Sequence, residues 1–295
     1  MFAGYPSPAM GQDGAMTSTA PERMPLAELL TLHPLLPLAW ESARKAGDFL
    51  LNERPDDLTV DSKSTPTDLV SAMDRTAEEM IIEGLLGQRL DDGFLGEEGG
   101  ERIGTSGVRW VVDPLDGTVN YLFGFPMWGV SIGMEQGGVT EMGVISTPAF
   151  NEHYIAVRGQ GAWIIKGDQG TRLNVRKCHD LGLAMIVTGF GYAPERRVSQ
   201  AAVILELIAQ VRDIRRLGAA VVDFAWLAQG RFDAYYERGL NAWDISAGML
   251  LAAEAGAEVG FLRGGEPSDL LVAVVPGIAQ ELRAELLRLD ADLGP

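Results

Sequence analysis

The sequence predicts a mixed α/β protein, and three observations support this fold class. Short apolar runs alternate along the chain with longer segments in which apolar residues recur every three or four positions. Strands and helices interleave from one end to the other instead of forming separate blocks, and no segment repeats another. At 295 residues the chain can bury roughly three quarters of its unfolded surface, so it needs no disulfides.

The first half of the chain is expected to form an N-terminal α+β lobe over residues 26–150. Residues 1–25 are rich in Gly, Pro, Ala and Met, have no periodicity, and are expected to be a disordered tail. Amphipathic helices are predicted over 34–54 and about 73–85, joined by the turn-rich segment 63–70. A short strand at 110–112 follows, and strands at 128–134 and 139–146 are expected to pair across Gln136-Gly137-Gly138.

The second half is expected to form a C-terminal α/β lobe over residues 151–295. Strands at 154–157 and 162–165 continue the β pattern after the expected boundary near 150. The remaining predicted strands are 184–188, 214–217, 232–237, 257–262 and 270–274. The predicted helices are 198–211, 218–229, 243–254 and 278–287.

Composition excludes several classes of function. The net charge of −17 argues against direct nucleic-acid binding, which depends on Lys and Arg neutralising phosphates. The single cysteine, Cys178, excludes an intramolecular disulfide, and three scattered histidines give no zinc pattern. No apolar run approaches a membrane span, and the N-terminus lacks a secretory signal. A cytoplasmic protein without membrane partners is therefore expected.

The segment from Asp113 to Thr118 is the first candidate site. An apolar strand ends there in two carboxylates, Asp113 and Asp116, which can point oxygens at one cation, and the Leu115 carbonyl can add a third. The amides of Gly117 and Thr118, at a helix start, face the position that an anion would take. A plain surface turn is the alternative. An EF-hand loop is excluded because its third and fifth positions are Leu115 and Gly117.

Three further acids stand at comparable places. Asp74 and Asp244 are each in the first turn of a predicted helix, where a carboxylate also stabilises the helix dipole. Glu97 follows a short apolar run within Gly96-Glu97-Glu98, which could instead be a solvated acidic loop. If these acids converge with Asp113 and Asp116, divalent ions must relieve their repulsion. Two ions about 3.5–4 Å apart make a phosphate-cleaving centre.

Four motifs together resemble the inositol monophosphatase family: 63–70 with Asp74, Gly96-Glu97-Glu98, 113–118 with Asn120, and Trp243-Asp244 with Ala247-Gly248. The resemblance runs from about residue 35 to 287 in the order and spacing of the family. It implies a lithium-sensitive, Mg²⁺-dependent phosphatase that is commonly a homodimer. The implied fold is a layered α-β-α-β-α sandwich whose active site lies between two lobes.

The resemblance also implies a role for each matching residue. Glu97, Asp113, the Leu115 carbonyl and Thr118 would hold one Mg²⁺; Asp113, Asp116 and Asp244 would hold a second; Glu97 and waters would hold a looser third. Asp74 and Thr118 would orient the attacking water, which Glu97 and the first ion activate. The phosphate would rest on the Gly117 and Thr118 amides. The ring would contact Asp116, Gly218, Ala219, Ala220 and Glu237, with Asp244 near the leaving oxygen.

The expected reaction is hydrolysis of inositol 1-phosphate, because Glu237 offers an acceptor for ring hydroxyls. Ala219 replaces a Thr found in many relatives, and Gly189-Phe190-Gly191 lies in a variable region at the substrate rim. Histidinol phosphate, fructose 1,6-bisphosphate and a 3′-phosphonucleotide therefore stay open. A bisphosphate would need rim cations, for which Arg196, Arg197, Arg215 and Arg216 are candidates. A different class is a regulatory binding protein of transcription complexes, as some bacterial relatives are.

Overall fold

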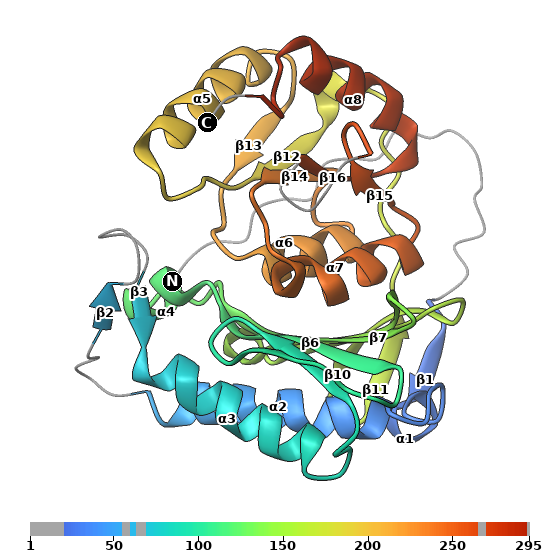
Figure 1. Ribbon diagram of the computed structural model, residues 1–295. Helices are drawn as coiled ribbons and strands as arrows, with labels where there is room; N and C mark the ends of the chain where they lie inside the picture. The colour runs from blue at the N-terminus through green and yellow to red at the C-terminus, as the bar shows by residue number, and fades with distance from the viewer. Residues whose placement is uncertain (1–20, 55–59, 63–68, 265–269, 294–295) are drawn as a thin grey trace, which may run out of the picture.

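The protein is a five-layer sandwich, as the resemblance implied (Figure 1). The computed structural model describes residues 21–54, 60–62, 69–264 and 270–293. Helices α2 (Leu36–Asn52) and α3 (Ala72–Leu86) cover one face of a nine-stranded sheet. Helices α6 (Ala220–Ala228) and α7 (Ala242–Glu254) lie between this sheet and a five-stranded sheet. Helices α5 (Pro194–Leu207) and α8 (Ala279–Arg288) form the last layer.

The nine-stranded sheet has the order β1-β11-β10-β9-β8-β7-β6-β4-β5. All its neighbouring strands are antiparallel except β4 and β6, which are parallel. The strands are β1 Arg23–Pro25, β4 Gly93–Gly96, β5 Gly100–Arg102, β6 Val108–Asp116, β7 Gly129–Gln136, β8 Val139–Thr147, β9 Glu152–Val157, β10 Gly161–Lys166 and β11 Gln169–Arg172.

The five-stranded sheet has the order β13-β12-β14-β16-β15 and mixes parallel and antiparallel pairs. Its strands are β12 Met185–Thr188, β13 Asp213–Arg215, β14 Ala234–Arg238, β15 Glu258–Phe261 and β16 Leu270–Val274. The short elements are helices α1 Leu26–Leu29 and α4 Thr118–Leu122, the 3₁₀ turns Pro148–Phe150, Leu181–Leu183 and Pro276–Ile278, and the strand pair β2 Val60–Ser62 and β3 Leu69–Ser71.

Two boundaries differ from the sequence-based expectation. Residues 23–25, assigned to a disordered tail, form β1 and pair with β11. Strands β9 to β11 complete the large sheet, so the chain leaves the first lobe after Arg172 and not near residue 150. Alternation of apolar and polar residues identifies a strand but not the sheet that it joins, which explains the second difference. Residues 1–20 and 63–68 lie outside the described residues, so the expectations for them are untested.

Strand β6 also differs from the prediction. It does not end at Val112 but continues to Asp116 through an irregularity, because Asp113 pairs with Ser131 and Asp116 with Gly129. Pro114 lies in this interruption, where a residue without an N–H does not disturb the ladder. The bulge thus turns the predicted acidic turn into a kink within the sheet, which redirects side chains as such bulges do elsewhere.

Close packing brings the second lobe onto the first. Apolar side chains fill the space between α2, α3 and the large sheet, and a second set fills the space between that sheet and α6 and α7. Two strand glycines lie directly under α7: a Cβ at Gly143 would stand 2.9 Å from Ala247, and one at Gly133 would meet Ser246. Because these positions lack side chains, α7 approaches the sheet closely and its first turn reaches the end of β6.

Candidate active site

The kink in β6 fixes the first two carboxylates. Asp113 is fully buried, and its Oδ1 accepts a hydrogen bond from the Leu115 amide at 3.0 Å. Asp116 ends the strand, and Gly117 follows with φ of +86°, which a residue with a side chain adopts only with strain. A Cβ at Gly117 would also stand 2.8 Å from the Met127 carbonyl oxygen. Gly117 therefore permits both the sharp turn and the immediate start of α4 at Thr118.

Thr118 lies between the Leu115 carbonyl and Asp74. Its Oγ1 lies 3.0 Å from the Leu115 oxygen and 3.3 Å from Oδ2 of Asp74, so its single proton can be donated to either. Asp74 is 1% exposed and comes from the first turn of α3, 44 residues earlier in the chain. The structure therefore brings Asp74 and Thr118 together, in the pairing that the resemblance implied.

Asp244 both stabilises the first turn of α7 and contacts the other acids of the cluster. It occupies the third position of α7, where its side chain accepts from the Asn241 amide at 2.6 Å in a capping box. The same carboxyl interacts with Asp113 from the first lobe. Asp116 makes the reverse connection, because its Oδ2 accepts from the Val221 amide of α6 at 2.6 Å. Two carboxylates thus join the lobes at the expected site.

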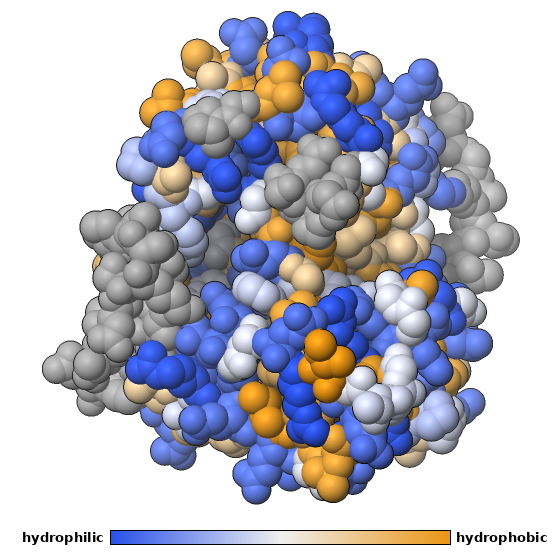
Figure 2. All heavy atoms as spheres, viewed as in Figure 1, coloured by the Kyte–Doolittle hydropathy of each residue, from blue (hydrophilic) through white to orange (hydrophobic). Residues whose placement is uncertain are grey.

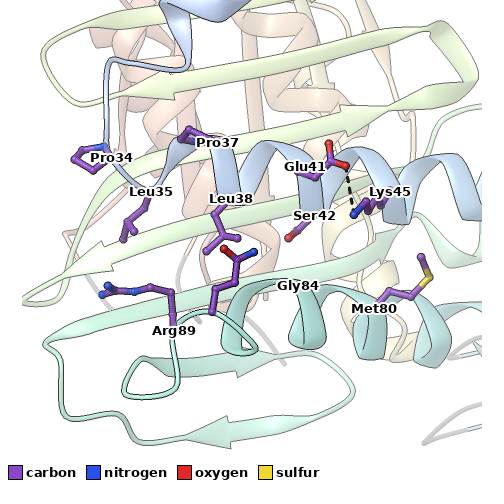
Figure 3. A pocket seen from close by; sticks show the side chains of 11 residues that line it. Pro34, Leu35, Pro37, Leu38, Glu41, Ser42, Lys45, Met80, Gly84 and Arg89 are labelled. Atoms are coloured by element: carbon purple, nitrogen blue, oxygen red, sulfur yellow. Dashed lines mark ion pairs between the residues drawn. The ribbon is translucent and has the colours of Figure 1, made fainter.

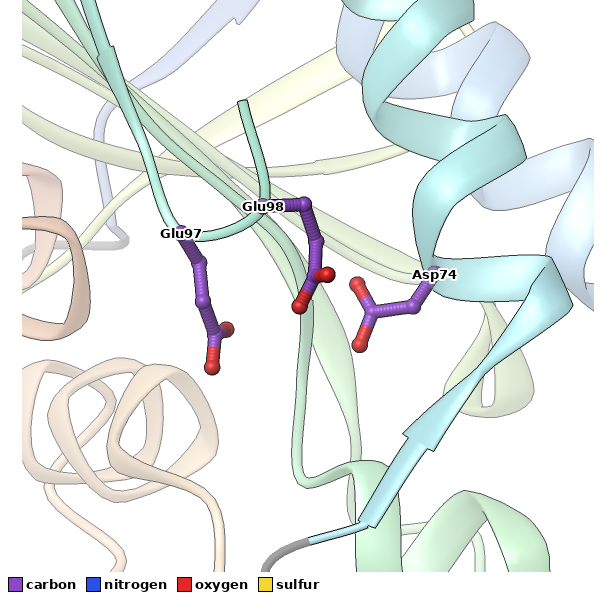
Figure 4. Close-up of side chains that lie close together, drawn as sticks. All are labelled: Asp74, Glu97 and Glu98. Atoms are coloured by element: carbon purple, nitrogen blue, oxygen red, sulfur yellow. The ribbon is translucent and has the colours of Figure 1, made fainter. Parts of the chain in front are cut away.

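Glu97 and Glu98 approach Asp74 from the turn between β4 and β5 (Figure 4). One carboxylate oxygen of each of these three residues lies within 4.8 Å of the other two. Glu98 belongs to the motif Gly96-Glu97-Glu98, but the family resemblance implies no role for it. The doubled acid in Gly96-Glu97-Glu98-Gly99 is the signal that could have identified it, because a tight turn presents both neighbouring side chains to the same region.

Electrostatics show that the acids converge. Burial raises the pKa of Asp113 well above its usual value, and Glu97, Asp116, Asp244 and Asp74 raise it further. Burial likewise raises the pKa of Asp116, with Asp244 the largest charge contribution. Burial raises the pKa of Asp244 to about 6, while its bond from the Asn241 amide acts in the opposite direction. All five predicted acids therefore interact at one place.

This donor set fits divalent cations. Like-charged carboxylates this close cannot all ionise at neutral pH unless cations lie between them. Among the described residues, Oδ2 of Asp113 is buried without a hydrogen-bond partner, although an ionised carboxylate oxygen needs one. The available donors among the described residues of the cluster are carboxylate, carbonyl and hydroxyl oxygens, which hard ions such as Mg²⁺ prefer.

The predicted ring contacts lie beside this cluster. Ala219 packs against the turn, with its Cβ 3.0 Å from where a Gly117 Cβ would be, and Ala220 begins α6. Asn120 ties the two lobes together here, because its amide donates to the Met127 and Leu217 carbonyls at 2.7 and 2.9 Å. The Leu217 contact fixes the residue before Gly218, whose φ is +90°.

Glu237, at the end of β14, completes this side. Its Oε2 accepts from the Tyr235 hydroxyl at 2.8 Å, and its carboxylate lies so close to Gly189 that no side chain fits there. Burial raises the pKa of Glu237 to about 7. The structure thus places Gly189 of the predicted rim segment beside Glu237.

The four candidate rim arginines separate in the structure. The Arg216 guanidinium occupies the space where Gly218 would carry a Cβ and lowers the pKa of Glu237, while Arg196 occupies that space at Gly191 and Gly239. Arg215 forms an ion pair with Asp213 at 2.5 Å, and Arg197 is exposed on α5. Only Arg196 and Arg216 therefore lie near the predicted leaving-group side.

Two buried acids near the site were not identified from the sequence. Glu78 of α3 is 3% exposed and its Oε1 accepts from the Glu98 amide at 3.1 Å. Asp223 of α6 is 1% exposed, and burial, Glu237 and Asp116 raise its pKa well above the usual value. Neither oxygen of Asp223 has a hydrogen-bond partner among the described residues. A lone acid within an apolar helix, as in Val222-Asp223-Phe224, is the signal that could have marked it.

A separate groove of about 410 Å³ lies between α2 and α3 (Figure 3). Its walls combine apolar residues such as Leu38 and Met80 with polar ones such as Lys45, which forms an ion pair with Glu41 at 3.4 Å. None of the predicted site residues lines it. The groove therefore takes no part in the arrangement of the acids.

Similarity to known proteins agrees with this geometry. Residues 31–289 match the model of the inositol monophosphatase family. The chain is 40% identical over 260 residues to inositol-1-monophosphatase SuhB of Mycobacterium tuberculosis, covering 85% of this chain and 90% of that protein. It is 41% identical over 258 residues to Nus factor SuhB of Pasteurella multocida, covering 85% and 95%.

A solved structure shows the same fold. The extragenic suppressor protein suhB of Bartonella henselae superposes with a TM-score of 0.78 at 34% identity, covering 86% of this chain and 98% of that one. In the part of the chain that the structure describes, no helix is long and apolar enough to cross a membrane. The family model, the similar proteins and the cluster of acids all point to the same family. The chain therefore belongs to the inositol monophosphatase family and is a phosphatase.

Proposed function

We propose that this protein is a Mg²⁺-dependent phosphomonoesterase that hydrolyses inositol 1-phosphate to inositol and phosphate. The convergence of Asp74, Glu97, Asp113, Asp116 and Asp244 from both lobes is the single observation that carries the proposal. The 40% identity to a relative named inositol-1-monophosphatase supports the choice of substrate. The acceptor of Glu237 beside the cluster fits a ring that carries hydroxyl groups.

The chain's own residues divide the work as follows. Glu97, Asp113, the Leu115 carbonyl and Thr118 would hold one Mg²⁺; Asp113, Asp116 and Asp244 would hold a second; Glu97 with waters would hold a looser third. When bound, these ions neutralise the carboxylates, polarise the phosphate oxygens and lower the pKa of a coordinated water molecule. An oxygen of Glu98 lies within 4.8 Å of oxygens of Asp74 and Glu97, which supports Glu98 as a further candidate ligand.

Asp74 and Thr118 position the attacking water. Because the Thr118 hydroxyl can donate to Asp74, its oxygen can at the same time accept a hydrogen bond from the attacking water. The Gly117 and Thr118 amides take the phosphate, and Asp116, Gly218, Ala219, Ala220 and Glu237 contact the ring. Asp244 lies near the leaving oxygen. Among the described residues, no cysteine, histidine or serine is paired as a nucleophile in this cluster, so direct attack by water is the consistent route.

A phosphate-release assay tests the proposal. Inositol 1-phosphate, histidinol phosphate, fructose 1,6-bisphosphate and a 3′-phosphonucleotide are compared with Mg²⁺, with Mg²⁺ and Li⁺, and with chelator. We expect inositol 1-phosphate to give the highest kcat/KM, Li⁺ to inhibit, and chelator to abolish turnover reversibly. Full turnover in chelator would exclude the metal mechanism. A higher kcat/KM for fructose 1,6-bisphosphate would favour the rim cations Arg196 and Arg216 over Glu237 as the specificity determinants.

A second candidate is a regulatory role in transcription complexes, because one relative at 41% identity is named a Nus factor. With a net charge of −17, such a role would use protein contacts and not direct contacts to nucleic acid. Asp116→Asn separates the two functions. It is expected to abolish phosphatase activity, and a regulatory role that survives it would be independent of catalysis.

The cellular setting is part of the same proposal. We propose a cytoplasmic homodimer. The family resemblance supports the dimer, and the single buried Cys178 supports a reducing compartment. Fractionation and light scattering test these two statements.

A further inference from the structure

Arg54 links the end of α2 to the end of α4, and it lies outside the motifs that resemble the family. Its Nε donates to the Tyr121 carbonyl at 3.1 Å, and its Nη2 donates to the Leu122 carbonyl at 3.1 Å. The guanidinium also lies 5.5 Å from the centre of the Tyr121 ring. The last carbonyls of a helix have no partner in a following turn, and a positive charge stabilises this end of the helix dipole. Arg54 therefore caps α4.

Tyr121 makes the reverse connection from α4 to α2. Its hydroxyl donates at 2.7 Å to the carbonyl of Leu50, which lies in the last turn of α2. Burial raises the pKa of Tyr121 to about 12, so the hydroxyl keeps its proton at neutral pH. The ring is 1% exposed and meets Trp128 edge to face, with centroids 5.0 Å apart. Each of the two helices thus caps the C-terminal end of the other.

Helix α4 needs such support because it has only five residues. Isolated helices shorter than about 12–15 residues are marginal in water, so contacts at its ends must hold it. Asn120 holds it toward the second lobe through the Leu217 carbonyl, while Arg54 and Tyr121 hold it toward α2. In Figure 1, α2 runs toward the side of the first lobe where α4 lies. Figure 2 shows mostly hydrophilic residues there, in agreement with the exposed side chain of Arg54.

The other end of α4 carries Thr118, one turn before Tyr121. The turn is closed by the Tyr121 amide, which donates to the Gly117 carbonyl at 2.9 Å, so a shift at one end moves the other. The Thr118 hydroxyl lies 3.3 Å from Oδ2 of Asp74, which is near the upper limit for a hydrogen bond between oxygens. A displacement of α4 by a few tenths of an ångström would therefore break this contact.

We infer that Arg54 and Tyr121 are positioning residues for the phosphatase reaction, which hold α4 against α2 and thereby keep Thr118 opposite Asp74. The inference rests on the proposed function, in which Thr118 and Asp74 orient the attacking water. It adds two residues that act through α4 and do not touch the substrate. Arg54 is exposed, so its replacement tests the inference without disturbing the core.

Steady-state phosphate release and thermal unfolding with Mg²⁺ test the role of Arg54. Arg54→Ala is expected to lower kcat 10- to 100-fold, because a displacement of about 1 Å can cost 100-fold in rate. Its unfolding temperature should change by less than about 3 °C. Arg44→Ala is the control, because Arg44 lies on α2 and pairs only with Glu41 and Asp48 of the same helix among the described residues. It should keep full kcat.

The outcomes separate this inference from the proposed function. Full kcat in Arg54→Ala, or an equal loss in Arg44→Ala, overturns the inference and leaves the phosphatase proposal intact. A loss of kcat that comes with a larger fall in unfolding temperature shows a general structural role and also overturns it. If the unaltered protein releases no phosphate from any ester tested, the proposed function fails and the inference fails with it.

A double-mutant cycle with Thr118→Val tests whether Arg54 acts through Thr118. If it does, Arg54→Ala should lower kcat less than threefold in the Thr118→Val background, because the hydroxyl that it positions is already absent. The same 10- to 100-fold loss in both backgrounds would show that Arg54 acts by another route. Arg54→Lys keeps the charge and one donor at the end of α4, and it should recover part of the lost kcat.

Hydrogen exchange in the metal-free protein gives a measurement that does not depend on turnover. The Tyr121 amide reports directly on the single turn of α4, because its bond to the Gly117 carbonyl closes that turn. Arg54→Ala should make this amide exchange at least tenfold faster, while amides in the middle of α2 keep their rates. Unchanged exchange at Tyr121 would mean that α4 is held without Arg54, and the inference would be wrong.

Discussion

The Thr118 hydroxyl connects the proposed metal ligand Leu115 to Asp74, which is proposed to position the attacking water. Replacing Thr118 by Val removes the hydroxyl that lies 3.0 Å from the Leu115 carbonyl and 3.3 Å from Asp74 while keeping the side-chain shape. Because positioned proton transfer contributes about 10²–10⁴-fold to rates, we expect Thr118→Val to lower kcat at least 100-fold with a change in KM of less than about fivefold.

Steady-state phosphate release by the purified variant measures this effect. Thr76→Val is the matched control, because the Thr76 hydroxyl also donates to a backbone carbonyl, that of Ala72, but on the exposed side of α3. It should retain full activity. Equal losses in the two variants would show that Thr118 acts through folding and not through the reaction.

Four other acids act on the carboxylate of Asp113. Its replacement is therefore expected to lower activity but to raise the stability of the metal-free protein. Burial first, and then Glu97 and the other acids, raise its pKa, so its ionised form is costly in the metal-free protein. Asp113→Asn removes this charge and keeps an oxygen that can accept from the Leu115 amide. We expect activity to fall by more than about 10³-fold, while the metal-free variant unfolds at a higher temperature than the unaltered metal-free protein.

Thermal unfolding in chelator and in Mg²⁺ checks both parts. Mg²⁺ should raise the unfolding temperature of the unaltered protein and have little effect on Asp113→Asn. A variant that still gains stability from Mg²⁺ would show that Asp113 is not a ligand.

At the scale of single elements, α3 supports the turn that carries Glu97 and Glu98. The Glu98 amide donates to Oε1 of Glu78, and the Glu78 carboxylate fills the space where Gly96 would carry a Cβ. Groups that orient metal ligands typically change metal affinity 10–100-fold when they are removed. We therefore expect Glu78→Ala to weaken activation by Mg²⁺ at least tenfold, because the turn loses its anchor.

The Mg²⁺ concentration that gives half-maximal activity is the measured quantity. Glu79→Ala controls for the loss of a negative charge on the same helix, since Glu79 is exposed. Its Mg²⁺ dependence should match that of the unaltered protein. Glu78→Gln keeps an acceptor oxygen and should recover most of the affinity; if it behaves like Glu78→Ala, charge and not anchoring explains the effect.

The elements also show what could be read from the sequence. Strand β16 coincides with the predicted range, and α2, α3 and α7 lie within a few residues of theirs, because their apolar spacing and caps are local signals. Helix α5 begins at Pro194 and not at 198, since a proline suits the first turn of a helix. The irregularity at Asp113 and the sheet assignment of β9 to β11 depend on partners distant in sequence, which local patterns do not contain.

The candidate site divides in the same way. Asp74, Glu97, Asp113, Asp116 and Asp244 are visible in the sequence as acids at strand ends and helix starts, and the family resemblance predicts a role for each. Glu78 and Asp223 were missed because each looks like an ordinary helical acid until burial is known. The local sequence therefore indicates acids at strand ends and helix starts. It does not indicate which acids within a helix, such as Glu78 and Asp223, are buried beside them.

For the whole molecule, the excess of acids becomes a dependence of stability on pH and Mg²⁺. Burial raises the pKa of Asp244 from 3.8 to about 6 and that of Glu237 from 4.5 to about 7. Between about pH 4 and 7 the folded metal-free protein therefore binds more protons than the unfolded chain. Its free energy of unfolding must fall as the pH rises through this range, because the slope follows the difference in bound protons.

We expect this fall to be on the order of 4 kcal/mol in chelator between pH 5 and 8, measured by chemical denaturation. Saturating Mg²⁺ should offset most of it at pH 8, since a ligand at 100 times its dissociation constant stabilises the folded state by about 2.7 kcal/mol. Glu237→Gln should reduce the slope in chelator without removing the effect of Mg²⁺, because Glu237 lies beside the proposed metal ligands and is not one of them. If the free energy of unfolding in chelator rose from pH 5 to 8, other groups of the folded chain would already stabilise these ionised carboxylates. Cations would then not be needed at the junction of the two lobes.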